Sequence, residues 1–313
     1  MNRRLRTIFM GTPAFAVPTL EALADHTDLQ LVITQPDRRQ GRGKKLVYSP
    51  VKARALELGV TIIGPSVVKG KRFAAKIATY EPDVIVTAAF GRILGPSLLR
   101  TPRYGCLNVH ASLLPKYRGA APINWAIING ETETGVSIMR TVEELDAGDV
   151  FMTRRVPITD QTAGELTEQL AKMGADALVE TLSKIDSIES VPQNHSAATF
   201  APVMSKEDGR LDWQKSAIVL ERQVRGMHPW PGTYAIWQGD TVKIHSASVI
   251  PTDSPVNASS GTVLNQTANG VDVACGSGNA IFRICSLQMP GKKRLDASQF
   301  YAGLKFPEGA SFA

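Results

Sequence analysis

The sequence predicts an α/β protein in which a doubly wound domain precedes a smaller β-rich module. In the first half, short β-branched runs alternate with helical patterns, as they do in βαβ units. These strand segments are nearly continuous apolar runs, which is typical of a parallel sheet covered by helices on both faces. After Asp208 the pattern changes to short alternating strands separated by Gly, Asn and Asp turns, which predicts a small β-barrel-like module.

The elements of the first domain follow from hydrophobic periodicity and from local stop and start signals. Ser49 is a good helix N-cap, and Pro50 suits the first helical position. A long amphipathic pattern over residues 163–187 predicts the helix that closes this domain, and residues 216–226 predict one helix before the β-rich module. Strands are expected at 5–11, 29–35, 60–65, 83–91 and 105–110, and the other helices at 16–25, 49–59 and 71–80.

Length and composition indicate a globular protein of about two domains. The chain has 313 residues, of which 43% are hydrophobic and 20% are charged. The polar, proline-containing stretch 189–206 separates the two patterns. We therefore expect a first domain at 1–188, a linker at 189–206 and a C-terminal domain at 207–313.

Several classes of protein are disfavoured by the sequence. The apolar runs are too short and too polar to span a bilayer, and the apolar run after the basic start breaks at Gly11 and Pro13, so we expect no membrane segment and no secretory signal. Cys106, Cys275 and Cys285 show no CxxC spacing, which argues against a disulfide framework and a zinc site. A cytoplasmic protein, in the bacterial cytosol, fits best.

The first βα turn, "FMGTPAFAVP", does not carry the GxGxxG fingerprint of a dinucleotide site. Gly11 either allows a tight turn before a helix that begins near Pro13 or contacts a ligand directly. In both interpretations the ligand is expected in the crevice beyond the carboxyl ends of the strands.

A polar pair ends the last predicted strand, in "LNVHASLLPKYRGAAP" at residues 107–122. Asn108 and His110 are two residues apart, so their side chains point to one face of a strand. They either meet one substrate or only bond their own backbone, as loop polar residues often do. Asp146 and Asp149 of "EELDAGDV" lie in a turn from which a carboxylate could reach an imidazole. These groups suit acyl transfer to an amine, and without a GxSxG serine the transfer would be direct.

Positive charge is concentrated rather than spread. The net charge is +6, and residues 38–54 ("RRQGRGKKLVYSPVKAR") contain seven Lys or Arg and no acidic residue. Such a run is either solvated surface or a flexible, glycine-containing loop that contacts a phosphate backbone. The later "GKKR" at 291–294 allows the same two interpretations.

The motifs together closely resemble the methionyl-tRNA formyltransferase family. The resemblance rests on "LNVHASLLPKYRGAAP", "FMGTPAFAVP", "QPDRRQGRGKKLVYSPVK", "AAFGRIL" and "LDAGDV", and it continues through "MSKEDGRLDW", "MHPWPGTY" and "SLQMPGKK". Ala111 and the "KYRG" turn depart mildly from the family pattern, and alanine at 111 requires a negative φ there. The Asn, His and Asp residues and "SLLP" are shared with other enzymes that use 10-formyltetrahydrofolate, so they indicate the chemistry rather than the acceptor.

The resemblance implies a Rossmann-like catalytic domain, an OB-fold-like C-terminal domain and a role for each motif. The implied reaction transfers the formyl group of 10-formyltetrahydrofolate to the α-amino group of methionine on initiator methionyl-tRNA, for translation initiation, without a metal. We expect a monomer. The implied catalytic residues are Asn108, His110 and Asp146; the folate pocket is lined by Ser112, Leu113, Leu114, Pro115, Phe90, Ile93 and Leu94; and tRNA is contacted by Arg38, Arg42, Lys44, Lys45, Lys292 and Lys293.

Two alternatives remain open. One is a formyltransferase or hydrolase that acts on a small molecule, such as a sugar amine, a ribonucleotide amine or water. The other is a tRNA-binding module with a degenerate folate site, against which the complete set of Asn108, His110 and Asp146 argues. Trp213, Trp230 and Trp237 are expected to pack rather than to stack on bases, and no catalytic role is expected for His228 or His245.

Overall fold

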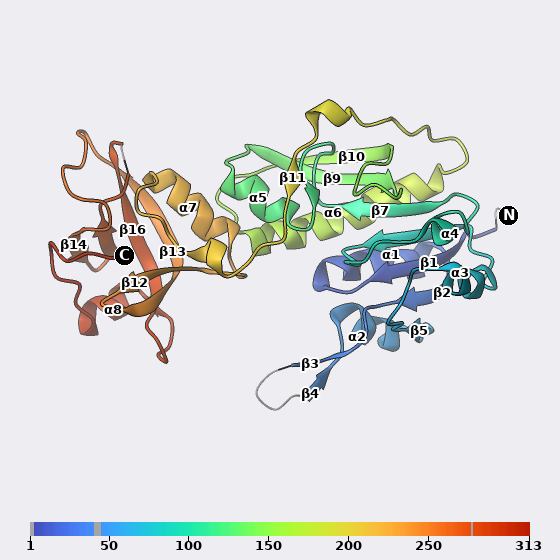
Figure 1. Ribbon diagram of the computed structural model, residues 1–313, viewed down its shortest axis with the longest axis horizontal. Helices are drawn as coiled ribbons and strands as arrows, with labels where there is room; N and C mark the ends of the chain where they lie inside the picture. Colours follow the sequence, from blue (N-terminus) through green and yellow to red (C-terminus); the bar gives the residue numbers. More distant parts are fainter. Residues whose placement is uncertain (1–2, 41–44, 277) are drawn as a thin grey trace. The chain divides into compact units, whose positions relative to one another are not determined.

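The apolar runs of the first half form a seven-stranded sheet. The computed structural model describes residues 3–40, 45–276 and 278–313, with the backbone alone at 38–40, 45 and 46. The strand order in this sheet is β10-β9-β7-β6-β1-β2-β5, and the five strands from β7 to β5 run parallel. These strands are β1 (Arg6–Gly11), β2 (Asp28–Ile33), β5 (Ile62–Ile63), β6 (Val84–Ala88), β7 (Cys106–His110), β9 (Glu133–Arg140) and β10 (Val150–Pro157) (Figure 1).

The sheet differs from a purely parallel one because β9 and β10 extend it in the antiparallel sense. Sequence analysis assigned no strands to these residues. Strand β9 has six consecutive buried residues, and β10, at the edge of the sheet, is partly buried or exposed at every position except Val156. A turn rather than a crossover helix joins β9 to β10, which is what an antiparallel pair permits.

Helices flank this sheet. The elements are η1 (Ala14–Ala16), α1 (Val17–His26), α2 (Pro50–Glu57), α3 (Lys71–Ala78), α4 (Pro96–Leu99) and α6 (Ala163–Ser183). Residues of α3 and α4 pack with Ile8, Met10 and Ile85 in one buried cluster. On the opposite face Gly174 of α6 approaches β7 closely, since a Cβ there would lie 2.5 Å from Val109. Ser49 caps α2 as predicted, its hydroxyl accepting from the Lys52 N–H at 3.2 Å.

Smaller pieces complete this part of the chain. Two short hairpin strands, β3 (Arg38–Gln40) and β4 (Lys45–Val47), pair antiparallel. The predicted linker contains η2 (His195–Ala197) and β11 (Phe200–Ala201), and β11 pairs in parallel with β8 (Arg118–Gly119). In Figure 1 this linker is the yellow-green to yellow segment that leaves α6 and ends in β11.

A second compact unit is built around an antiparallel sheet of order β12-β13-β16-β15-β14, with β17 paired to β16. The chain divides into unit 1 (1–122, 133–157 and 167–202) and unit 2 (123–132, 158–166 and 203–313). Unit 2 contains α5 (Pro122–Ile128) from its second residue on, and then η3 (Glu207–Gly209), α7 (Ala217–Gly226), β12 (Thr233–Trp237), β13 (Asp240–Pro251), β14 (Val263–Thr267), β15 (Gly270–Val273), β16 (Ala280–Gln288), β17 (Leu295–Asp296) and α8 (Ala297–Gly303).

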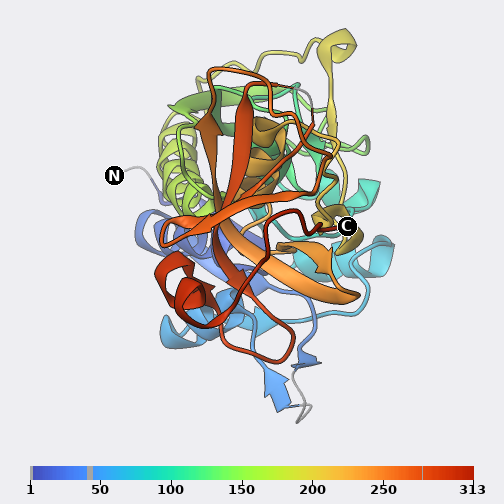
Figure 2. The ribbon, with the colours of Figure 1, turned by 90° about the vertical axis from the view of Figure 1, so that its left-hand side faces the viewer.

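The last residues of the chain join the two edge strands of this sheet. Ala313 exchanges two backbone hydrogen bonds with Ile236 of β12, and Val263 of β14 donates to the Ala310 carbonyl. The segment therefore bridges β12 and β14 by backbone hydrogen bonds. Figure 2 shows the orange and red strands of this unit crossing one another as they curl.

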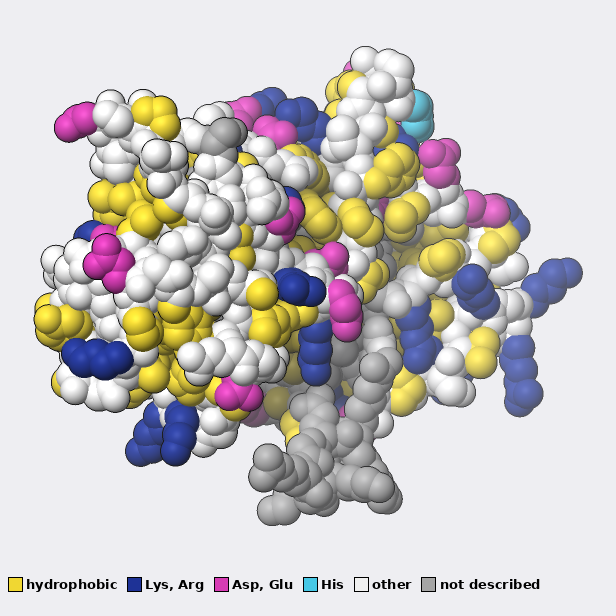
Figure 3. Space-filling view, turned by 60° about the vertical axis from the view of Figure 1, so that its left-hand side comes forward, with side chains coloured by type: hydrophobic (Ala, Val, Ile, Leu, Met, Phe, Trp, Pro, Cys, Tyr) yellow, Lys and Arg dark blue, Asp and Glu magenta, His cyan; other side chains and the backbone are white. Residues whose placement is uncertain are grey.

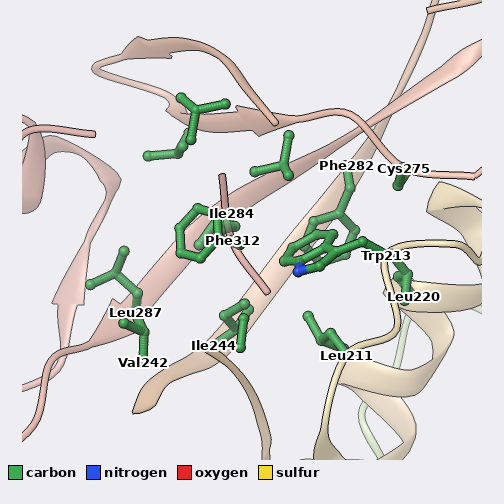
Figure 4. Packing of buried hydrophobic residues seen from close by; sticks show 14 of the residues in the cluster. Leu211, Trp213, Leu220, Val242, Ile244, Cys275, Phe282, Ile284, Leu287 and Phe312 are labelled. Carbon is green, nitrogen blue, oxygen red and sulfur yellow. The ribbon is translucent and has the colours of Figure 1, made fainter. Parts of the chain in front are cut away.

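The core of unit 2 is aromatic. Trp213 meets the Phe282 ring edge-on at 5.5 Å (Figure 4). Trp237 lies 4.7 Å from the Phe312 ring. The prediction that tryptophans pack is confirmed for Trp213 and Trp237, each 5% exposed, but it is wrong for Trp230, which is 56% exposed. In the described ranges, no helix is both long and apolar enough to cross a membrane.

Candidate active site

The carboxyl ends of the parallel strands form the edge where the candidate residues lie. Strands β1 and β6 are neighbours although the chain passes through β2 and β5 between them, so the strand order reverses at this point. In doubly wound sheets, ligands bind in the crevice outside such a switch point. A Cβ at Gly11 would lie 2.7 Å from the Phe9 ring, so packing alone accounts for this glycine.

Asn108 lies on β7 beside Thr87 of β6, its register partner. The Thr87 hydroxyl donates to Asn108 Oδ1 at 2.8 Å. This bond fixes the orientation of the amide and uses its oxygen. The Asn108 Nδ2 group has no hydrogen-bond partner among the residues that the structure describes, so its two N–H groups are available to a ligand.

His110 ends β7, two residues beyond Asn108, and it is 5% exposed. Its Nε2 lies 3.0 Å from the Tyr117 carbonyl oxygen, and since a carbonyl only accepts, Nε2 carries a proton. The other ring nitrogen, Nδ1, lies 3.7 Å from Asp146 Oδ2. Nδ1 is therefore the ring nitrogen that faces the carboxylate.

The turn between β9 and β10 carries Asp146. The Gly119 N–H donates to Asp146 Oδ2 at 2.8 Å, which fixes the carboxylate that faces His110. Asp146 has φ of +47°, a left-handed conformation that costs energy for a residue with a side chain. Asp149, the other carboxylate considered from the sequence, instead accepts from the Ser190 hydroxyl at 3.3 Å. The structure thus brings Asp146, and not Asp149, to the imidazole.

The "SLLP" segment lies directly after these groups. Ser112 is fully buried and its hydroxyl donates to the Lys116 carbonyl at 2.6 Å, whereas Leu113, Leu114 and Pro115 are partly exposed. The Leu114 N–H donates to the Ser137 hydroxyl at 3.2 Å, which ties the segment to β9. The φ of Ala111 is not positive, and this is the condition that an alanine at this position has to meet.

The second predicted lining segment is divided between core and surface. Phe90 and Leu94 are each 4% exposed and belong to the cluster under α3 and α4, whereas Ile93 is 59% exposed. Ala89 and Gly91 have φ of +43° and +71°, and the Phe90 carbonyl accepts from the Gln35 amide at 3.0 Å. The side chains of Phe90 and Leu94 therefore support the sheet, while Ala89, Gly91 and Ile93 are exposed.

The basic residues are only partly described. Arg42 and Lys44 lie outside the described residues, and Arg38 and Lys45 belong to β3 and β4, where the backbone alone is described. Lys292 and Lys293 are exposed in the turn before β17. Figure 3 shows Lys and Arg side chains standing apart from one another on the face in view. Within the described part of the chain, no three His, Cys, Asp or Glu side chains gather into a set that could hold a metal ion.

Sequence reasoning missed the groups that hold these residues in place: Thr87, the Tyr117 carbonyl, the Gly119 N–H and, from the predicted linker, Gln193. Gln193 donates to the carbonyl oxygens of Asp146 and Gly148 at 2.8 and 2.7 Å. None of them carries a local signal, because each depends on strand register or on where a distant segment lies.

Comparison with known proteins defines the class. The family described as formyl transferase matches residues 4–182, and its C-terminal domain family matches residues 203–305. This chain belongs to the formyl transferase family. The first match falls on the doubly wound domain and the second on the β-rich domain, so both parts of the chain correspond to this family.

Curated relatives indicate which enzymes of the formyl transferase family this chain is similar to. The methionyl-tRNA formyltransferase of Acetivibrio thermocellus is 43% identical over 309 residues, covering 97% of this chain and 98% of that protein. The methionyl-tRNA formyltransferase of Geobacter metallireducens is also 43% identical, covering 97% of each chain. The enzyme of the same name from Caldanaerobacter subterraneus is 44% identical over 97% of this chain and 99% of its own.

Solved structures share the fold at low identity. WlaRD, a sugar 3N-formyl transferase crystallised with dTDP and 5-N-formyl-THF, has a TM-score of 0.66 at 17% identity, covering 93% of this chain and 100% of its own. HypX from Aquifex aeolicus in complex with tetrahydrofolic acid has a TM-score of 0.61 at 18% identity over 96% of this chain. This chain spans about half of HypX, 48% of its length.

Proposed function

We propose that this chain transfers the formyl group of 10-formyltetrahydrofolate to the α-amino group of methionine on initiator methionyl-tRNA. The product is N-formylmethionyl-tRNA, used in translation initiation. The observation that carries the proposal is the placement of Asn108, His110 and Asp146 at one edge of the sheet. The Asn108 Nδ2 group has no partner among the described residues, and the Asp146 carboxylate lies 3.7 Å from the imidazole. Relatives of that name at 43% identity support the choice of acceptor.

The chemistry divides between the three side chains. As the amine attacks the formyl carbon, negative charge develops on the formyl oxygen, and the Asn108 Nδ2 group is free to donate to it. Because Nε2 of His110 carries a proton toward the Tyr117 carbonyl, Nδ1, beside Asp146, is the ring nitrogen that can take the proton that the amine loses. The bond from the formyl carbon to N10 then breaks, and tetrahydrofolate leaves with a proton at N10. Thr87 and Gly119 keep the amide and the carboxylate in their orientations.

The residues present fit the formyl donor, because donors and apolar surface meet at the same edge. 10-Formyltetrahydrofolate would supply the formyl group as a co-substrate. We assign its pocket to Ser112, Leu113, Leu114 and Pro115 together with Phe90, Ile93 and Leu94. In the second segment Ile93 and the main chain would make the contacts, since Phe90 and Leu94 are buried in the core.

We further assign tRNA binding to the basic loop and to the second domain. In the basic loop, phosphates would be contacted by Arg38, Arg42, Lys44 and Lys45. The exposed Lys292 and Lys293 would add phosphate contacts from the second domain. We propose that this domain is OB-fold-like and spans 207–313, after a catalytic domain at 1–188 and a linker at 189–206. Neutralising Arg42, Lys44 and Lys45 should flatten the slope of log affinity for tRNA against log salt. An unchanged slope would remove the loop from the interface. We also propose a cytoplasmic monomer, which light scattering on the purified protein would check.

The decisive experiment is a formylation assay with purified protein, 10-formyltetrahydrofolate and charged initiator or elongator tRNA. We expect rapid formylation of the initiator, and a loss of about a hundredfold or more in Asn108→Ala and in His110→Ala, the scale of one lost oxyanion donor. Formylation of sugar or nucleotide amines in place of tRNA would refute the assignment of the acceptor. Turnover at the wild-type rate in either variant would refute the assignment of the site.

A further inference from the structure

Arg118 is a buried cation next to the candidate site. It is 2% exposed, and it precedes Gly119, whose N–H holds the Asp146 carboxylate. Its guanidinium donates to Gln193 Oε1 through Nε at 3.2 Å and through Nη2 at 2.9 Å. It also reaches His195 Nδ1 at 3.1 Å and Glu144 Oε1 at 3.3 Å. A buried charge is tolerated only when it is paired and hydrogen-bonded, and Gln193 accepts two of the bonds that Arg118 donates.

Gln193 connects this cation to the turn that carries Asp146. It is 7% exposed, and its Nε2 donates to the carbonyls of Asp146 and Gly148 at 2.8 and 2.7 Å. Both amide protons and the amide oxygen are therefore used. A side chain that bridges two carbonyls two residues apart fixes the backbone between them, which here includes a left-handed Asp146.

The turn also lies close to β9 at Gly148. A Cβ on Gly148 would lie 1.9 Å from the Arg140 carbonyl oxygen, so the backbone there already touches β9. The linker segment also fixes the other partner of Asp146. The Tyr117 N–H donates to the Thr199 hydroxyl at 2.9 Å, and Ala201 is the register partner of Gly119. The segment expected to serve only as a linker thus contacts both sides of the His110–Asp146 pair.

We propose that Gln193, held by Arg118, is a positioning residue for the transfer reaction: it sets the Asp146 turn so that the carboxylate faces His110 Nδ1. This rests on the proposed function. Gln193 touches no reacting atom in this assignment, and its effect on the rate passes through Asp146.

The test uses the full-length chain and a matched glutamine. Gln223 of α7, 6% exposed, donates in the same manner to the carbonyls of Asp208 and Arg210, within unit 2. Gln193→Leu should lower the transfer rate constant at saturating substrates about tenfold to a hundredfold, with little change in KM for tRNA, as loss of an orienting partner typically does. Gln223→Leu should leave that rate constant unchanged. Gln193→Glu keeps the acceptor for Arg118 but loses both donors, and it should also be slow.

A double-mutant cycle separates positioning from general damage. In an Asp146→Asn background, Gln193→Leu should cost less than about threefold, because the carboxylate it positions is already gone. An equal loss in both backgrounds, or a wild-type rate in Gln193→Leu and Gln193→Glu, would overturn the proposal. Amide hydrogen exchange at residues 146–149 gives a readout without activity. Faster exchange in Gln193→Leu, but not in Gln223→Leu, supports the positioning role of Gln193, and unchanged exchange in Gln193→Leu overturns it. This readout holds even if the wild type formylates no tRNA, which would refute the proposed function separately.

Discussion

Gln193 in unit 1 and Gln223 in unit 2 make the same local contact with different consequences. Each donates its amide protons to carbonyls two residues apart, those of Asp146 and Gly148 or those of Asp208 and Arg210. The Gln193 oxygen accepts two bonds from a buried guanidinium. The Gln223 oxygen is buried and, among the described residues, has no partner.

The two glutamines differ in the groups that surround them. Beside the candidate site, the glutamine belongs to a chain of hydrogen bonds that runs from Arg118 to the Asp146 turn. In unit 2 the glutamine holds one loop, and the surrounding core is apolar and aromatic; within the described residues the buried Trp213 Nε1 also lacks a partner. Fully connected polar networks fix a geometry, whereas apolar packing mainly supplies stability.

If unit 2 depends on ring packing, removing a ring should have the largest effect on stability. Trp237 is 5% exposed and lies 4.8 Å from the Phe306 ring and 4.7 Å from the Phe312 ring. We expect Trp237→Ala to lower the free energy of unfolding of unit 2 by about 3–5 kcal/mol. Hydrogen exchange in denaturant, compared between β12–β13 and β6–β7 peptides, measures each unit separately. Trp230→Ala, at a 56% exposed ring, is the control, and it should cost less than about 1 kcal/mol.

The sequence predicted the parts of the site that depend on local rules. Asn108 and His110 share one face of β7 because side-chain direction alternates along a strand, and that period is visible in the residues themselves. Gln193 was not found, since a glutamine in a polar, proline-containing stretch carries no sign of the turn it will contact. The distance from Gln193 to Asp146 is set by how residues 189–201 lie along unit 1, and 47 residues separate the two in the chain.

The same difference between local signals and distant contacts explains which parts of the fold could be predicted. The parallel strands and the capped helix at Ser49 follow from apolar runs and from an N-cap with proline behind it, which are local signals. The antiparallel pair β9 and β10 was missed, although β9 has a buried run like those of the other strands. Strand direction depends on the connection between strands and not on the strand itself, so this part of the topology required the structure.

The contrast between the glutamines predicts unequal stability costs. Gln193→Leu leaves a guanidinium that is 2% exposed without two of its bonds, and it should lower the free energy of unfolding by about 2–3 kcal/mol. Gln223→Leu leaves two carbonyls without their donor, as Gln193→Leu does, but the oxygen that it removes has no partner among the described residues. We therefore expect Gln223→Leu to lower the free energy of unfolding by about 1 kcal/mol. The exchange experiment on the two sets of peptides measures both. An equal or larger cost for Gln223→Leu would show that the Arg118 network does not depend on Gln193.

An effect smaller than that of Gln193→Leu is expected from a buried thiol in unit 1, and it appears only in alkali. Burial raises the pKa of Cys106 from its ordinary value of 9.0 to about 12. Because the folded pKa is the higher one, the unfolded chain loses its proton first as the pH rises. The neutral thiol therefore favours folding fully below about pH 9, and this contribution is lost as the pH rises through 12, at about 1.4 kcal/mol per pH unit.

Cys106→Ala should remove this part of the alkaline loss of stability, about 1.4 kcal/mol between pH 8 and pH 10. Unfolding followed by exchange in β6–β7 peptides at the two pH values gives the difference directly, so that any constant cost of the smaller side chain cancels. Cys285→Ala, at a thiol that is only partly buried, controls for the loss of a cysteine as such. If wild type and Cys106→Ala lose stability in parallel as the pH rises, the Cys106 thiol ionises as readily in the folded chain as in the unfolded one.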